Sequence, residues 1–507
     1  MRYSTGKSSA AISILLLFVL FVLATQFAQA QRLADFEGKM TEFTLDNGLK
    51  LLVLERHEVP VVSFHSYADV GSVDEVKGIT GLAHLFEHMA FKGTKTIGTR
   101  DYKAEAEALA KVDRIFEAMK IERRKGGHAD KARLDRLDAE FKEAQQEAQK
   151  YIVPDEYEET LTRAGSKGFN AYTSEDATQY IISLPSNKIE LWMALESDRF
   201  LNPVLREFYK EKDVVMEERR MGENAPSNRL SEEFQAIAFK AHPYGEPVIG
   251  HMSDLETLTR TEAETFFKKY YSPQNLTIAI VGDVNPQQVK KLAQKYFAGI
   301  PGAPRPDPVE TVEPPQLGER RIVIDDPSQP LLYIGYHRPD FNHSDNAIFD
   351  TIAEIIGIGR TSRLYKTLVK EKKMAVNAGA FSGGSKYPAL FLFYAVPAKG
   401  RIPQECESAI YAEIEKLKAE PVLPEELQKA KTRSRADLIS QLDSNSGLAA
   451  QLAFYQVITG DWRNLFGRLD KINKVTAEDI QRLAKECFVT KNRTVGIIQT
   501  AQSQTGP

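Results

Sequence analysis

The feature that most constrains the fold of this chain is an internal repeat. Residues 259–281 can be laid over residues 476–498 without a gap, with an identical threonine at the start of each. Each segment continues with a helical pattern and ends in an apolar run typical of a buried strand. Near the starts of the two halves, residues 60–64 (PVVSF) can be set against residues 330–334 (PLLYI). A generic helix-then-strand similarity is the alternative to a true repeat.

The repeat predicts two tandem domains of α+β structure. At 507 residues the chain exceeds the size of one comfortable hydrophobic core. Six prolines fall within residues 301–318, which we interpret as a linker. We therefore expect a first domain at residues 31–300, a second domain at residues 319–500 and a short tail at residues 501–507.

A polar, highly charged segment explains why the first half is the longer one. It runs from about residue 100 to about residue 150, has helical composition and is interrupted at Gly126-Gly127. We expect it to form an inserted antiparallel helical hairpin that is exposed to solvent and takes no part in catalysis.

Residues 1–30 have the pattern of a secretory signal peptide. Arg2 and Lys7 precede an apolar run that is short for a membrane span, and the segment ends in a small-x-small cleavage pattern. We expect cleavage before Gln31 and a mature protein that is soluble in a periplasm or secreted. An uncleaved membrane anchor is the alternative.

Charge and cysteine content add little to this picture. The net charge of -4 is small, so composition gives no sign of nucleic-acid binding. Export permits a disulfide, but the two cysteines, Cys406 and Cys487, do not establish one.

The chemistry of the chain is concentrated in His84, Glu87 and His88. Residues 82–89 contain neither proline nor glycine and are apolar at most positions, so we predict a buried helix there. Residues four apart lie on the same face of a helix, so the two imidazoles project the same way with the carboxylate beside them. Two imidazoles and a carboxylate on one buried face favour a bound cation.

Zinc suits this set of side chains, and we predict one Zn²⁺ per chain. A catalytic zinc ion is held by three protein ligands and keeps one position open for water. Glu87 can act as the general base that takes a proton from the attacking water and passes it to the leaving amine. A helix with two ordinary core histidines is the alternative, although histidine is scarce here, with 9 in the chain.

The motif also carries a resemblance to a known family. The order His-x-x-Glu-His is that of the inverzincins, and residues 84–94 (HLFEHMAFKGT) resemble the insulinase or pitrilysin (M16) metallopeptidases, most of all the processing-peptidase-like bacterial group. The resemblance runs from about residue 40 to residue 500. It implies two tandem homologous domains, each an antiparallel β-sheet backed by helices, which together enclose a chamber.

The resemblance also implies a third zinc ligand on a later helix. The family phrase is matched by residues 211–218 (EKDVVMEE), so the ligand carries over to Glu218. Glu211 lies two helical turns earlier on the same face, and by resemblance it orients a metal-bound imidazole. Glu217 is the competing ligand, and it would point about 100° away around the helix.

A further family phrase predicts where substrate binds. Asn170 and Ala171 lie in the stretch FNAYTS and match the family's substrate strand, whose backbone pairs with an extended peptide. The side chain of Asn170 would hold the peptide near the scissile bond. An ordinary turn asparagine at the end of a strand is the alternative.

One departure from the family concerns the second half. Family members that act as one chain carry an Arg and a Tyr there that bind substrate and steady the oxyanion, but the matching positions here are Val369 and Val376. Arg363 and Tyr365 lie nearby with a spacing that indicates a structural role. Without these donors, the oxyanion that develops in the transition state would lose several kcal/mol of stabilisation. We therefore expect a heterodimer with a zinc-less homologue that supplies them.

These observations predict a zinc-dependent endopeptidase that hydrolyses short or unfolded peptides in an exported compartment. A non-catalytic scaffold or assembly subunit of the same fold is the main alternative. Loss of the zinc ligands would mark such a scaffold, and here they are intact. A zinc-buffering protein, which would bind metal without hydrolysis, is a third possibility.

Overall fold

The computed structural model describes residue 36 and residues 38–500. The proposed signal peptide, residues 1–30, and the tail, residues 501–507, lie outside the described residues. The strands of the first half are β1 Met40–Thr44, β2 Lys50–Glu55, β3 Val61–Ala68, β4 Lys167–Thr173, β5 Thr178–Pro185 and β6 Leu276–Gly282. Its helices are α2 Leu82–Met89, α3 Tyr102–Arg123, α4 Lys131–Gln149, α5 Glu156–Arg163, α6 Ile189–Leu201, α7 Phe208–Glu223, α8 Pro226–Ala238, α9 Met252–Thr257, α10 Arg260–Tyr270 and α11 Pro286–Phe297.

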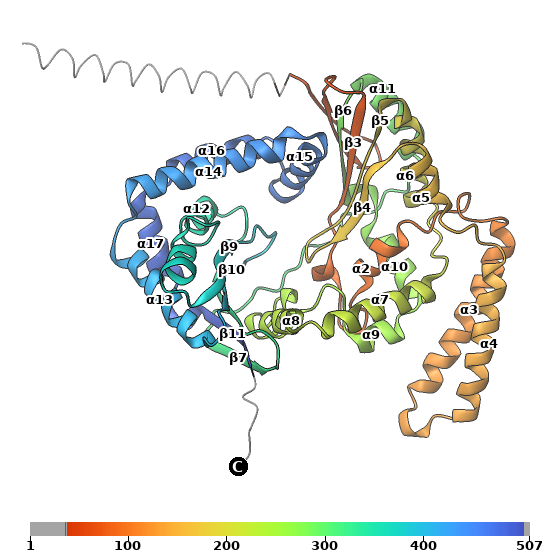
Figure 1. Ribbon diagram of the computed structural model, residues 1–507. Helices are drawn as coiled ribbons and strands as arrows, with labels where there is room; N and C mark the ends of the chain where they lie inside the picture. Colours follow the sequence, from red (N-terminus) through yellow and green to blue (C-terminus); the bar gives the residue numbers. More distant parts are fainter. Residues whose placement is uncertain (1–35, 37, 501–507) are drawn as a thin grey trace, which may run out of the picture.

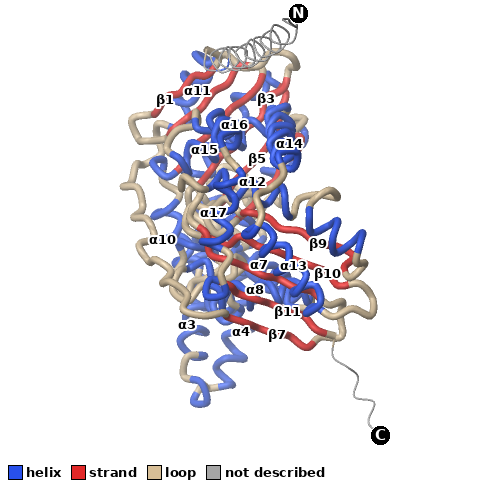
Figure 2. The backbone as a smooth tube through the Cα atoms, turned by 90° about the vertical axis from the view of Figure 1, so that its left-hand side faces the viewer, coloured by secondary structure: helices blue, strands red, loops and turns tan. Residues whose placement is uncertain are grey.

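The second half repeats the plan without the hairpin. Its strands are β7 Arg320–Asp325, β8 Leu331–Arg338, β9 Ala375–Ser382, β10 Ala389–Pro397 and β11 Arg493–Gln499. Its helices are α12 Asn346–Ile356, α13 Pro403–Ala419, α14 Pro424–Asp443, α15 Asn445–Thr459, α16 Asn464–Lys474 and α17 Ala477–Cys487, with a π-helical segment at Tyr365–Glu371. Figures 1 and 2 show the two halves, each with its own sheet.

The two sheets have the same strand order. The first runs β1-β2-β6-β3-β5-β4 and the second runs β7-β11-β8-β10-β9, so that only β1 lacks a counterpart. All neighbouring strands are antiparallel except for one parallel pair in each sheet, β2 with β6 and β7 with β11. The predicted fold class, two tandem α+β domains, is confirmed.

The repeated segments form equivalent elements. Thr259 caps α10 by accepting a hydrogen bond from the backbone N–H of Glu262, and Thr476 caps α17 in the same way through Asp479. Each helix leads into a central strand, β6 or β11, whose side chains are almost all buried. The repeat is therefore present in the tertiary structure as well as in the sequence.

Each half contributes a helix to the other half's sheet. One face of the first sheet packs against its own helices, as where Phe64 stacks on Trp192 at 4.0 Å. The opposite face is covered by α15 of the second half, which shares a buried apolar cluster with β2, β3 and β6. Conversely, α8 of the first half lies on β7, β11 and β8. This exchange of helices ties the two halves together.

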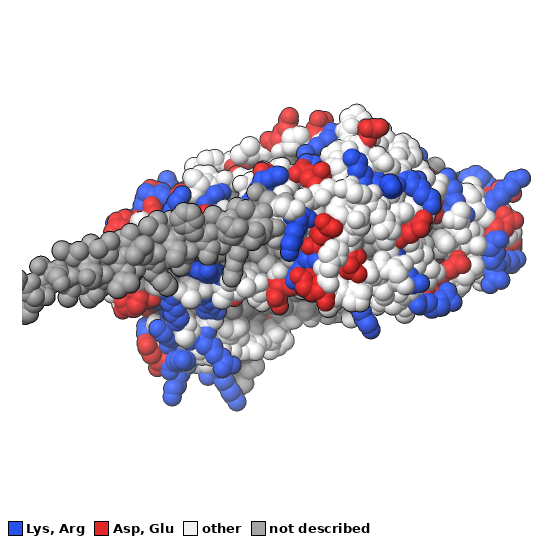
Figure 3. Space-filling model, turned by 90° about the horizontal axis from the view of Figure 1, so that it is seen from above, with Lys and Arg blue, Asp and Glu red and all other residues white. Residues whose placement is uncertain are grey.

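The charged segment forms a helical hairpin of α3 and α4 that projects from the body (Figure 1). Helix α3 is attached to the body along its length by two pairs, Lys120 with Glu262 at 2.9 Å and Asp113 with Arg260 at 2.5 Å. On the face seen in Figure 3, Lys and Arg side chains occur beside Asp and Glu side chains over most of the described surface.

Three further features bear on predictions made from the sequence. Cys406 and Cys487 are both buried free thiols in this structure. Among the described residues, no helix has the length and apolar character needed to cross a membrane. Residues 301–318 contain neither helix nor strand. Within them, the Glu313 carboxylate accepts hydrogen bonds from the backbone of the first half at residues 240–242.

Candidate metal site

Helix α2 carries the two histidines and begins at a buried carboxylate. Gly81, just before the helix, has φ +90°, and a Cβ there would lie 2.6 Å from the carbonyl oxygen of Ile249, so the position requires glycine. The Glu75 carboxylate accepts hydrogen bonds from the N–H groups of Gly81 and Ala83, at 2.8 and 2.6 Å. Burial raises the pKa of Glu75 to about 8 despite these bonds.

The motif side chains lie on the less buried face of α2. The apolar residues of the helix, such as Leu85 and Phe86, pack into the core of the first half. His84 and His88 are 13% and 24% exposed, and Glu87 is half-buried. The expectation that they lie on a buried face is corrected to a partly buried one, because an amphipathic helix buries only one side completely.

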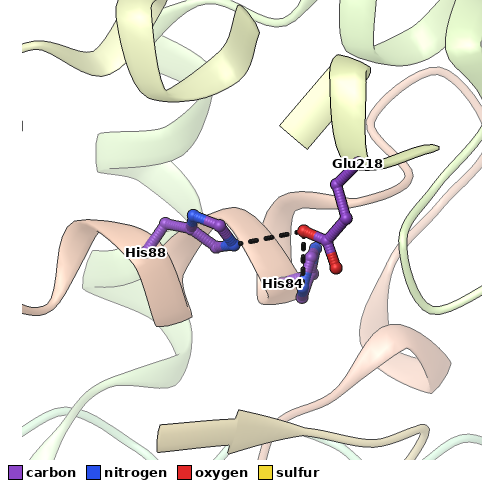
Figure 4. Close-up of side chains that lie close together, drawn as sticks. All are labelled: His84, His88 and Glu218. Atoms are coloured by element: carbon purple, nitrogen blue, oxygen red, sulfur yellow. Dashed lines mark ion pairs between the residues drawn. The ribbon is translucent and has the colours of Figure 1, made fainter. Parts of the chain in front are cut away.

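The third side chain of the site is Glu218 of α7 (Figure 4). One oxygen of its carboxylate lies 3.8 Å from Nε2 of His84 and 3.5 Å from Nε2 of His88. The ligand atoms of these three residues all lie within 4.8 Å of one another. Two helices that are far apart in the sequence therefore bring two imidazoles and one carboxylate to a single point.

This donor set fits a zinc ion. Bond lengths of about 2.0–2.2 Å and tetrahedral geometry place two ligand atoms of one zinc ion about 3.4 Å apart. The observed separations of 3.5 and 3.8 Å are close to that value. Burial lowers the pKa of His84, which favours the neutral imidazole that a metal requires.

Glu211 lies behind the second imidazole, on the side of Nδ1. Its carboxylate lies 3.7 Å from Nδ1 of His88 and 2.6 Å from the Nζ of Lys92. Glu211 is the largest cause of the raised pKa of His88. Burial alone would raise the pKa of Glu211, but His88 and Lys92 outweigh it and lower that pKa below its ordinary value. Glu211 thus lies where a carboxylate would orient a metal-bound imidazole.

The structure distinguishes Glu218 from Glu217, the alternative third ligand. Glu217 is 63% exposed and forms an ion pair with Arg220 at 3.0 Å. Glu217 is therefore not among the converging residues. Glu87 lies close enough to both imidazoles that its charge raises the pKa of each.

Arg206 holds the loop that follows α2, a role that the sequence did not predict. Its guanidinium donates to the carbonyl oxygens of Lys92, Thr94 and Ile97. It also pairs at 2.8 Å with Glu105, and both side chains are almost completely buried. No local sequence signal marks either residue, because each is an ordinary charged residue until the fold buries it. Glu75 was missed for the same reason.

The predicted substrate residues lie on an edge strand beside the site. β4 pairs with β5 alone, so its outer edge is open among the described residues. Asn170 is exposed on β4, whereas Ala171 is buried. Phe169 of the same strand contacts Phe91, which follows the metal helix, with ring centroids 4.7 Å apart. The strand is therefore packed against the segment that carries the motif.

Val369 and Val376, where the resemblance to the M16 metallopeptidases would place an Arg and a Tyr, are both apolar. Val369 lies in the π-helical segment and packs against the core of the second half, while Val376 is exposed on β9. Arg363 pairs with the Glu426 carboxylate at 3.0 and 2.6 Å, which agrees with the structural role expected for it.

Two family models match the chain, and together they cover more than half of it. The model described as "Insulinase (Peptidase family M16)" matches residues 51–113 and 144–251. The model described as "Peptidase M16 inactive domain" matches residues 257–434. The unmatched stretch, residues 114–143, lies within the α3–α4 hairpin.

Individual proteins are similar over nearly the whole chain. The zinc protease PqqE of Helicobacter pylori is 28% identical over 484 residues, covering 94% of this chain and 96% of that protein. A crystal structure of a protease from Helicobacter pylori has a TM-score of 0.77 at 27% identity, covering 91% of this chain and 99% of that one. The first half of the periplasmic protease PqqL from Escherichia coli has a TM-score of 0.66 at 18% identity, over 91% and 92%, which shows a shared fold.

Proposed function

Because this chain belongs to the insulinase (M16) peptidase family, we propose that it is a zinc-dependent endopeptidase that hydrolyses short or unfolded peptides. The observation that carries the proposal is the convergence of His84, His88 and Glu218 within 4.8 Å. Relatives named zinc proteases support the same chemistry.

Each side chain has a distinct task in this proposal. His84, His88 and Glu218 would hold Zn²⁺, which when bound polarises the peptide carbonyl and lowers the pKa of a water molecule. Glu87 accepts the proton of the attacking water and then donates it to the nitrogen of the leaving amine. Glu211, 3.7 Å from Nδ1 of His88, would orient this ring so that its Nε2 stays directed toward Glu218.

The open edge of β4 suits an extended substrate. A peptide that adds to this edge as a further strand would form backbone hydrogen bonds with β4, and Asn170 is exposed there to contact it. Most segments of a folded protein are already paired or packed, so they cannot add to this edge without local unfolding. This requirement supports short or unfolded peptides as the substrate class.

The proposal includes a location outside the cytoplasm. Residues 1–30, read as a cleavable signal peptide, support a periplasmic or secreted enzyme. A signal-processing site found by N-terminal sequencing of the exported protein at Gln31 would agree with it. An intact Met1 in the mature protein would contradict it.

The role of Glu87 provides the direct test. The Glu87→Gln variant should keep its zinc, because no metal ligand is removed, and should lose about 10²–10⁴-fold in turnover because the general base is gone. Elemental analysis measures the zinc, and a quenched fluorescent peptide measures cleavage. Wild-type turnover in this variant would show that Glu87 is not the base.

A non-catalytic scaffold remains the rival function, and two observations favour it. The second half matches a model described as an inactive domain, and its Val369 and Val376 stand where the family has its substrate-binding Arg and Tyr. A scaffold predicts no cleavage by the purified chain. A zinc-buffering protein predicts bound metal without cleavage, so the same pair of measurements separates all three functions.

We further propose that a zinc-less homologue completes the site as a heterodimer. The chain lacks the second-half donors, and another subunit could supply an Arg and a Tyr near the developing oxyanion. The purified chain should then cleave peptides weakly and gain activity when the homologue is added. Full activity of the isolated chain would rule out this arrangement.

A further inference from the structure

We propose that an apolar cavity on the inner face of the second sheet binds an apolar side chain of the peptide substrate at a distance from the scissile bond. The inference rests on the proposed peptidase function and adds a substrate preference to it. The cavity has a volume of about 840 Å³ and is lined by residues from both halves. This volume is in the usual range for ligand sites, roughly 300–1,000 Å³.

One wall of the cavity is formed by the face of the second sheet that lies opposite its core. Apolar side chains on this face are only partly buried. Along β10, Phe391, Phe393 and Ala395 point into the core of the second half. The alternating residues Leu392 and Tyr394 line the cavity and are only half-buried. Strand residues alternate between the two faces, so a surface-facing set of this kind would ordinarily be polar.

The face is open because α8 covers only part of it. This helix lies on β7, β11 and β8, and its Phe234 meets Tyr333 edge-on with ring centroids 5.9 Å apart. Phe381 of β9 lines the same cavity and is 48% exposed. In Figure 1, β9 and β10 lie on the side of the second half that faces the first half. An exposed apolar surface in that position indicates a binding function.

The cavity borders a second cavity that reaches one of the proposed metal ligands. This second cavity, of about 580 Å³, is lined by Glu218 itself. Four residues line both cavities: Glu175, Ser231, Gln235 and Tyr244. This adjacency supports a path for an extended peptide from Glu218 through the smaller cavity to the larger one.

The two cavities differ in chemistry, and this difference defines the ligand. The smaller cavity is lined by several charged residues, including Arg219, Glu232 and Glu246. Of the residues that line the larger cavity in the described structure, only Glu175 is charged, and it lies at the shared boundary. Burying a charged side chain among aromatic and aliphatic groups is unfavourable, so the larger cavity selects Phe, Leu or a similar side chain.

Binding can be measured separately from cleavage. The probes are short fluorescein-labelled peptides of polar sequence in which a single Phe is moved stepwise along the chain, with an all-polar peptide as reference. Anisotropy is measured with the Glu87→Gln variant, so that the peptides remain intact. We expect at least one Phe position to bind about 10-fold more tightly than the reference.

Two substitutions in the Glu87→Gln background test the cavity itself. Leu392→Asn should abolish the advantage of the Phe peptide, and Leu392→Asp should do so by placing a charge in the cavity. Val323→Asn is the matched control, since Val323 is 44% exposed on the same sheet but does not line the cavity. Unchanged zinc content and melting temperature establish that each variant is folded. An advantage of the Phe peptide that survives either folded Leu392 variant would overturn the proposal.

The cavity proposal and the peptidase proposal can be contradicted independently of each other. If the wild-type chain cleaves peptides but Leu392→Asn leaves the Phe preference unchanged, the cavity proposal is wrong and the peptidase proposal stands. If no peptide is cleaved but the Phe-dependent binding is lost in Leu392→Asn, the cavity proposal stands and the peptidase proposal is wrong.

Discussion

Replacing Glu218 by Gln should remove most of the zinc affinity, whereas replacing its neighbour Glu217 should not. The Glu218 oxygen lies 3.5 and 3.8 Å from the two imidazole nitrogens, whereas Glu217 is 63% exposed and paired with Arg220. Zinc sites with four protein ligands bind with roughly 10–16 kcal/mol, or roughly 3 kcal/mol per ligand. Loss of Glu218 should therefore weaken zinc binding by about two orders of magnitude.

The matched variants make this comparison internally controlled. Glu217→Gln removes the same charge from the same helix, and loss of an exposed ion pair changes stability by less than about 1 kcal/mol. Zinc affinity is measured by competition with a chromogenic chelator for both variants and the wild type. The reasoning is refuted if Glu217→Gln loses zinc while Glu218→Gln binds it normally.

Two further predictions concern stability. Arg206→Met leaves the Glu105 carboxylate buried without its partner, so urea unfolding should show a loss of about 3–5 kcal/mol; the prediction fails if the double variant with Glu105→Met is no more stable than the single one. Burial lowers the pKa of His65 to about 4 in the folded chain, from its ordinary value of 6.5. Between these two pH values the imidazole is therefore neutral in the folded chain but protonated in the unfolded chain. The unfolding free energy should therefore fall by up to about 3 kcal/mol between pH 6.5 and 4, and His65→Gln should reduce that fall; an equal fall in both proteins would contradict the assignment.

Local patterns in the sequence were sufficient to predict the main elements. The helix at residues 82–89 and the hairpin break at Gly126-Gly127 are where their patterns place them. The repeat predicted equivalent helix-and-strand units, which the structure shows as α10 with β6 and α17 with β11. These features depend on neighbouring residues, so periodicity and capping residues are enough to identify them.

Strand direction and the exchange of helices could not be predicted in the same way. The parallel pair in each sheet depends on how a crossover returns the chain, and apolar alternation does not encode that direction. Likewise, α8 and α15 have apolar faces in the sequence, but nothing local indicates that each covers the sheet of the other half.

The sequence alone determined that two imidazoles and a carboxylate would share one side of a helix, because helical geometry fixes the direction of side chains four residues apart. Only the tertiary structure decided that Glu218 and not Glu217 reaches them, since that depends on how α7 packs against α2. The tertiary structure also decided which ordinary charged residues became buried supports, namely Glu75, Glu105 and Arg206. Contacts between segments more than about a hundred residues apart arise from packing of the whole chain, which no short stretch of sequence specifies.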